Sequence, residues 1–143
     1  MDYTQLLAEV QEDGSFPGRE EAEALVVSVL MAMAEVLPGP QLDALASQLP
    51  PEATVYLRRT RSQPDPLFDS HLFLGWVVSS LDATAGRDKT VGGLDFTAAY
   101  SGEEAIRRAR CVFAAIKSRL DSHEQQDIAS VLPDEVDAWF RDA

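Results

Sequence analysis

The side chains of this sequence best suited to metal binding or nucleophilic catalysis are two histidines and a single cysteine. Asp127 follows His123 by four residues, which places both on one face of a helix. However, neither His71 nor His123 belongs to an H-x-x-x-H or H-E-x-x-H pattern, the spacing that helical zinc sites use. Arg110 could lower the pKa of the Cys111 thiol, but Cys111 lies within a predicted helix, where cysteine usually packs as a small apolar residue. We therefore expect no catalytic residue and no metal site.

The stretch AGRDKTVGG (85–93) looks superficially like a phosphate-binding loop. A Walker A loop follows the pattern G-x-x-x-x-G-K-[ST], because glycine N–H groups must wrap the phosphates beside the lysine. Here Asp88 stands where the glycine before Lys89 is needed, and Ala83 replaces the first glycine. A carboxylate repels a phosphate, so we expect no bound nucleotide and no cofactor.

Basic and aromatic side chains are better candidates for a binding surface, because arginine, tyrosine and tryptophan are enriched where proteins meet. Tyr56 and Trp139 stand beside arginines in the segments YLRR and WFRD. A second basic group lies between positions 107 and 119, and it would suit an acidic protein partner. A solvated helix face is the alternative for these residues. The candidate partner-binding residues are Arg58, Arg59, Arg110, Lys117 and Arg119.

The charge of the chain is strongly unbalanced. Its 143 residues carry a net charge of −12, and residues 1–59 alone contribute −7, from ten acidic and three basic side chains. An acidic chain repels phosphate backbones, so we expect no nucleic-acid partner. The hydrophobic content of 45% is high enough for a folded core and argues against disorder.

Composition also indicates a compartment. One cysteine allows no intramolecular disulfide. The first residues are acidic and lack the basic and apolar segments of a signal peptide. The longest apolar run, residues 24–34, is too short to span a bilayer. We expect a cytoplasmic protein with no membrane partner.

A repeat then indicates which elements position these residues. ASQLPPEATVYL (46–57) returns as ASVLPDEVDAWF (129–140), a shift of 83 residues. The same shift places residues 20–57 on residues 103–140 without a gap, and apolar residues mostly meet apolar residues. The pattern indicates an internal duplication.

The apolar spacing within the repeat is helical. Ile106, Ala109, Phe113, Ile116 and Leu120 recur in steps of three and four, which places them on one helix face. A shorter helix follows each long one and ends at a Leu-Pro pair, at positions 49–50 and 132–133. Prolines then open a closing helix, because proline is tolerated in a helix's first turn.

Local polar residues refine the helix ends. Asp121 or Ser122 can cap the shorter helix of the second copy. Pro133 is expected to begin its closing helix, with Asp134 and Glu135 in the first turn, where carboxylates favour the helix dipole.

Further helices are expected ahead of each repeat, at YTQLLAEV near the start and HLFLGWVVSSL at 71–81. The predicted fold is all-α, with about eight helices arranged as two pseudo-symmetric four-helix units. The units span residues 1–59 and 69–143, joined by a proline-containing connector at 60–68. An inserted loop at about 83–100 belongs to the second unit, and the whole is expected to form one compact domain.

These marks resemble a known family. A long helix opening with EEA, a short helix ending in QLP and a closing aromatic-basic helix are similar to the bacterial domain-of-unknown-function family number 2267. The resemblance covers nearly the whole chain outside residues 83–100. It implies an all-helical fold and a bacterial origin, and it supplies no catalytic residues.

Three functional hypotheses remain open. The first is a non-enzymatic helical interaction module that binds another protein or a second copy of itself. The second is a small-ligand binder or enzyme with an apolar pocket between the units, closed by the 83–100 loop. Its lining would be Trp76, Phe96, Tyr100, Tyr56 and Trp139. The third is an acidic inhibitor that covers a basic site on its partner.

Overall fold

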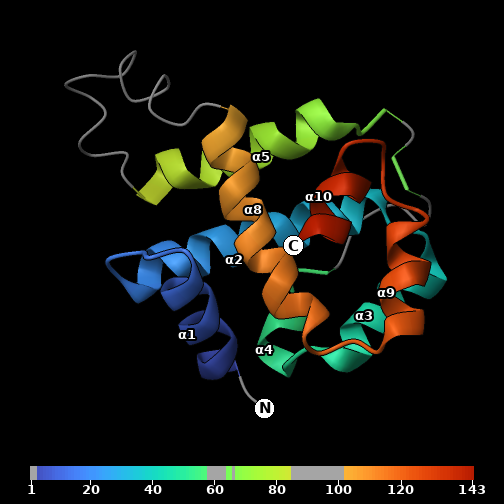
Figure 1. The fold of residues 1–143 in the computed structure, drawn as a ribbon, viewed down its shortest axis with the longest axis horizontal. Coiled ribbons are helices and arrows are strands. Elements are labelled where there is room, and N and C mark those ends of the chain that lie inside the picture. The colour runs from blue at the N-terminus through green and yellow to red at the C-terminus, as the bar shows by residue number, and fades with distance from the viewer. Residues whose placement is uncertain (1–2, 58–63, 66, 85–101) are drawn as a thin grey trace.

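The computed structural model describes residues 3–57, 64–65, 67–84 and 102–143. Within these ranges the protein is all-helical and contains no strand, as the apolar spacing predicts. Figure 1 shows the arrangement of its eight described helices. They are α1 (Tyr3–Asp13), α2 (Arg19–Val36), α3 (Gly39–Gln48), α4 (Pro51–Thr54), α5 (Ser70–Thr84), α8 (Gly102–Lys117), α9 (Ser122–Ala129) and α10 (Val136–Asp142).

The two long helices organise the molecule. In Figure 1, α2 runs through the middle and α8 crosses it, and the two helices are in contact. Helix α1 packs against both, as does α5, while α10 packs against α8. The shorter helices α3 and α9 meet through polar side chains, with Gln41 donating to Asp127 at 3.4 Å and Gln48 to Glu124 at 3.2 Å. The seam between α1 and α8 is the part of this frame that positions the candidate site.

One apolar cluster includes residues from every described helix. Phe113 of α8 is fully buried between two other rings. Its centroid lies 5.8 Å from that of Phe73 on α5 and 5.3 Å from that of Phe140 on α10. These separations are typical of favourable aromatic pairs. Phe113 therefore joins α5 and α10 to α8 within the core.

The helix ends follow their local chemistry where the sequence is most specific. Helix α2 ends at Val36, just before Pro38, and Pro51 occupies the first turn of α4. Asp121 caps α9, accepting from the backbone N–H of Glu124 at 2.7 Å, and Glu124 accepts from the backbone N–H of Asp121 at 3.1 Å. This reciprocal pair is a capping box, so Asp121 rather than Ser122 is the cap.

The start of the last helix differs from the prediction. Helix α10 begins at Val136, not at Pro133, so Asp134 and Glu135 do not lie in its first turn. Glu135 instead precedes the helix with a φ of 75°. Its carboxylate accepts a 2.7 Å hydrogen bond from the Ser70 hydroxyl at the start of α5. A tertiary hydrogen bond thus accompanies a backbone conformation that non-glycine residues rarely adopt.

Positions related by the 83-residue shift are alike in burial. Leu30 and Phe113 are both fully buried, as are Met33 and Ile116. This similarity is compatible with duplication, and the two-unit organisation is retained as an interpretation. Most of the predicted 83–100 loop lies outside the described residues, although α5 extends into it as far as Thr84.

Candidate functional site

Lys117 bonds within the molecule. Its ammonium donates hydrogen bonds to the main-chain oxygens of Phe140, Arg141 and Ala143, at 2.9, 3.0 and 3.1 Å. These oxygens lie at the C-terminal end of α10, where helix carbonyls lack intrahelical partners and favour a cation. The ammonium also lies 5.5 Å from the centroid of the Phe140 ring. Lys117 therefore caps α10.

Arg119 is also held inside the fold. Only 2% of its side chain is exposed, and its two terminal nitrogens contact the Glu9 carboxylate of α1 at 2.5 and 3.3 Å. It donates further hydrogen bonds to the Ala115 carbonyl at 2.8 Å and the Ser118 hydroxyl at 3.1 Å. The pair links α1 to the turn that follows α8, and its two residues are 110 positions apart in sequence.

The three basic candidates that the structure describes therefore do not gather into one patch. Arg110 is exposed and reaches the Asp142 carbonyl at 3.4 Å, so it turns toward α10 as Lys117 does. Arg119 turns toward α1 instead. Arg58 and Arg59 lie outside the described residues.

The aromatic candidates for an apolar pocket also separate. Trp76 packs edge-on against Phe68, with ring centroids 5.0 Å apart. Tyr56 and Trp139 are partly buried against the core. Tyr56 follows α4, which lies across the molecule from the α5 helix that carries Trp76 (Figure 1). The structure does not bring these two together, and Phe96 and Tyr100 lie outside the described residues.

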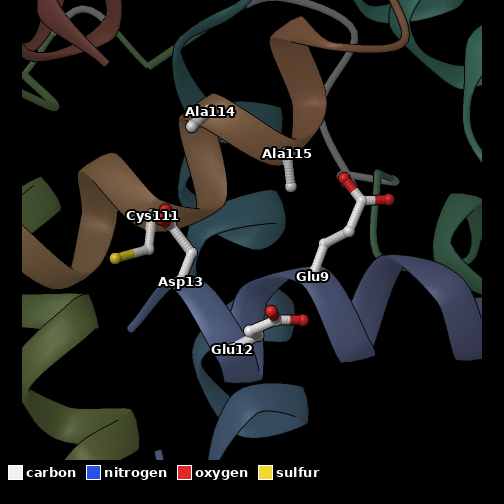
Figure 2. A pocket seen from close by; sticks show the side chains of 6 residues that line it. All are labelled: Glu9, Glu12, Asp13, Cys111, Ala114 and Ala115. Carbon is white, nitrogen blue, oxygen red and sulfur yellow. The ribbon is translucent and has the colours of Figure 1, made fainter. Parts of the chain in front are cut away.

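A groove lies instead along the seam between α1 and α8. Glu9, Glu12 and Asp13 line it from α1, and Cys111, Ala114 and Ala115 line it from α8, around a volume of about 340 Å³ (Figure 2). A second hollow of about 360 Å³ shares Glu9 and Glu12 with the first. Its other lining residues are Gln5, Ala8, Ser118 and Arg119. We call the two together the α1–α8 groove.

The architecture of the groove follows from its residue types. Glu9, Glu12 and Asp13 stand at i, i+3 and i+4, which places them on neighbouring positions of one helix face. The facing side of α8 presents small side chains at Cys111, Ala114 and Ala115, and Ser118 follows in the next turn, so open space remains opposite α1.

The three carboxylates have different surroundings. Glu9 is paired with Arg119. Asp13 faces the Cys111 thiol, and burial together with this carboxylate raises the pKa of Cys111. Glu12 is exposed, and its carboxylate forms no hydrogen bond or ion pair within the described part of the chain. Within the described ranges Glu12 and Asp13 thus form no ion pair, although Asp13 also interacts electrostatically with Arg107.

The groove is poorly suited to nucleophilic or metal chemistry. A raised pKa keeps Cys111 protonated near neutral pH, and the thiolate is the reactive form. Its sulfur donates to the Arg107 carbonyl at 3.4 Å. In the described ranges, no group of three or more His, Cys, Asp or Glu side chains is arranged to hold a metal ion. His71 and His123 are both exposed.

Sequence reasoning did not identify this groove. The three carboxylates on one face of α1 were a usable signal, but the small residues opposite them lie about a hundred positions later. Only the packing of α1 against α8 shows that the two sets face each other.

Comparison with known proteins places the chain in a family. A search of curated proteins finds none that matches. No helix in the described ranges is long and apolar enough to cross a membrane. A family model described as "Uncharacterized conserved protein (DUF2267)" matches residues 3–139, nearly the whole chain. The all-helical fold and this match agree with the resemblance noted from the repeated helix ends, and the chain belongs to the DUF2267 family.

Proposed function

We propose that this protein is a non-enzymatic helical interaction module, and that its α1–α8 groove binds a basic segment of a partner protein. The observation that carries the proposal is a groove with carboxylates on one wall and small side chains on the other. The cytoplasmic setting expected from composition belongs to the same proposal.

Charge and shape both favour a lysine- or arginine-rich segment. The long stems of these side chains pack along apolar surface while their charged ends seek carboxylates or water. The alanines of α8 offer such a surface opposite Glu12 and Asp13. The net charge of −12 would also steer a cationic partner toward the protein.

An acidic partner is less favoured. Among the basic candidates, Lys117 is engaged by three main-chain oxygens and Arg119 by Glu9. A partner that drew Lys117 or Arg119 away would break these contacts, and their loss would offset the binding free energy that the partner contributes. The groove is therefore the better candidate, and it agrees with the third hypothesis, an acidic surface that covers a basic site.

A titration of ¹⁵N-labelled protein with an octalysine peptide tests the proposal. We expect the largest amide shifts at residues 5–13 and 110–119. The double variant Glu12→Gln/Asp13→Asn should bind about 5- to 10-fold more weakly, because each exposed ion pair contributes up to about 1 kcal/mol.

The matched control is Asp43→Asn/Asp134→Asn, which removes the same charge at exposed sites outside the groove lining. It should bind like the parent. Absence of peptide binding, or an equal loss in both double variants, would contradict a specific basic-segment site in the groove.

A further inference from the structure

Glu9 differs from the other two carboxylates of the groove. It is 49% exposed, but both of its oxygens contact an arginine whose side chain is 98% buried. The two contacts form the fork that a guanidinium makes with a carboxylate, which fixes orientation as well as distance. Glu9 thus lines both hollows of the groove while already holding a cation.

Arg119 depends on this partner. Its other hydrogen bonds go to neutral oxygens close to it in sequence, at Ala115 near the end of α8 and at Ser118 just after it. Its Nε is buried without a hydrogen-bond partner in the described part of the chain. Removing the Glu9 charge would leave a buried guanidinium uncompensated, which is strongly destabilising in proteins. A ligand cation that drew Glu9 away would meet the same cost.

We propose that Glu9 and Arg119 form a closed ion pair between α1 and the turn after α8 that does not bind the partner's cations, and that Glu12 and Asp13 are the carboxylates that do. This inference rests on the proposed function, because it divides the acidic residues of the same groove into two roles. The Glu9–Arg119 pair adds no net charge to the groove.

The division of roles predicts opposite results for two kinds of variant. In Glu9→Met/Arg119→Met the ion pair is replaced by apolar side chains, a change that proteins often tolerate when both charges go together. Its affinity for octalysine should stay within about 2-fold of the parent. Glu12→Gln should weaken binding by about 3- to 5-fold and reduce its salt dependence, because one exposed ion pair is lost. Asp43→Asn is the single-charge control outside the groove lining and should bind like the parent.

A second measurement tests the same division of roles in the parent protein, so it does not depend on whether the double variant folds. In protein labelled with ¹³C at side-chain carboxyls, octalysine should shift the signals of Glu12 and Asp13. The Glu9 signal should stay in place, because its oxygens keep their contacts with Arg119.

The outcomes separate this inference from the proposed function. A folded Glu9→Met/Arg119→Met protein that loses affinity as Glu12→Gln does, or a shifted Glu9 carboxyl signal, would overturn the division of roles while leaving the groove as the site. Absence of octalysine binding to the parent, or shifts away from α1 and α8, would overturn the proposed function itself.

Discussion

Glu104 of α8 contacts two arginines of its own helix. Arg107 lies 2.8 Å away and Arg108 lies 2.6 Å away. A spacing of four residues would favour Glu103 as the partner of Arg107, but the structure pairs Arg107 with Glu104 at a spacing of three. Arg108 also lies 4.9 Å from the centroid of the buried Phe16 ring. Arg108 therefore connects the ion pairs of Glu104 on α8 to the turn that follows α1.

The two arginines change how Glu104 binds protons. Hydrogen bonds from Arg107 lower the pKa of Glu104 from 4.5 to about 2, with a further contribution from Arg108. A pKa that is lower in the folded protein means that ionisation stabilises the fold. This stabilisation is complete above about pH 4.5 and is lost as the pH falls through about 2.

We therefore expect Glu104→Gln to lower the free energy of unfolding by about 1 kcal/mol at pH 7, a modest value because Arg107 is half-exposed to solvent. The difference from the parent should shrink below about pH 4.5 and vanish near pH 2. Urea unfolding across this pH range measures it. The exposed neighbour Glu103→Gln is the control, and an equal, pH-independent loss in both variants would contradict the assignment.

At the scale of elements, α10 shows how a short helix depends on its neighbours. It has seven residues, and isolated helices of that length are unstable in water. Val136 and Phe140 are buried beneath it, and Lys117 of α8 caps its end. Because these contacts come from other parts of the fold, local sequence signals placed its start three residues too early.

We predict that Lys117→Met lowers the free energy of unfolding by about 2 kcal/mol, because the terminal carbonyls of α10 lose a charged donor. Hydrogen exchange of residues 136–142 should speed up more than exchange elsewhere. Arg110→Met, which removes a single 3.4 Å contact to the same helix end, should cost less than about 0.5 kcal/mol. Equal effects of the two substitutions would mean that Lys117 does not cap α10.

At the scale of the whole molecule, the two sequence copies share one core. The buried cluster includes Leu30 from the first half and Phe113 from the second, and α2 contacts α8. A shared core of this kind usually unfolds in a single cooperative step. We therefore infer that the two repeats unfold together as one domain, and that the two-unit description refers to the sequence.

This inference predicts that Phe113→Ala lowers the free energy of unfolding by about 3–5 kcal/mol and Leu30→Ala by about 2–5 kcal/mol, the usual costs of truncating fully buried side chains. Each variant should unfold in urea in a single transition, with the same midpoint by circular dichroism and by tryptophan fluorescence. The midpoint should fall relative to the parent, with little change in the dependence of the free energy of unfolding on urea concentration. Two separate transitions, or a loss under about 1 kcal/mol in both variants, would show that the halves or the core face are assigned wrongly.

The sequence by itself determined the helical class and several helix boundaries, although α4 ends at Thr54, before the YLRR segment, and α8 ends at Lys117, before Leu120. Steps of three and four between apolar residues, the prolines at 38, 50 and 51, and the carboxylate of Asp121 act within a few residues of their own position. Helical hydrogen bonds are equally local, running from one residue to the fourth before it. Such information can be read along the chain, as could the acidic face of α1.

Only the tertiary structure decided what each charged side chain does. Lys117 and Arg119 look equivalent in sequence, two residues apart in one predicted helix, but one caps α10 and the other pairs with Glu9. The α1–α8 groove likewise needs alanines that stand about a hundred residues from the carboxylates they face. Helix crossings are set by the combined burial of many side chains from both halves. The partners that meet at those crossings therefore cannot be read from the residues beside them in the chain.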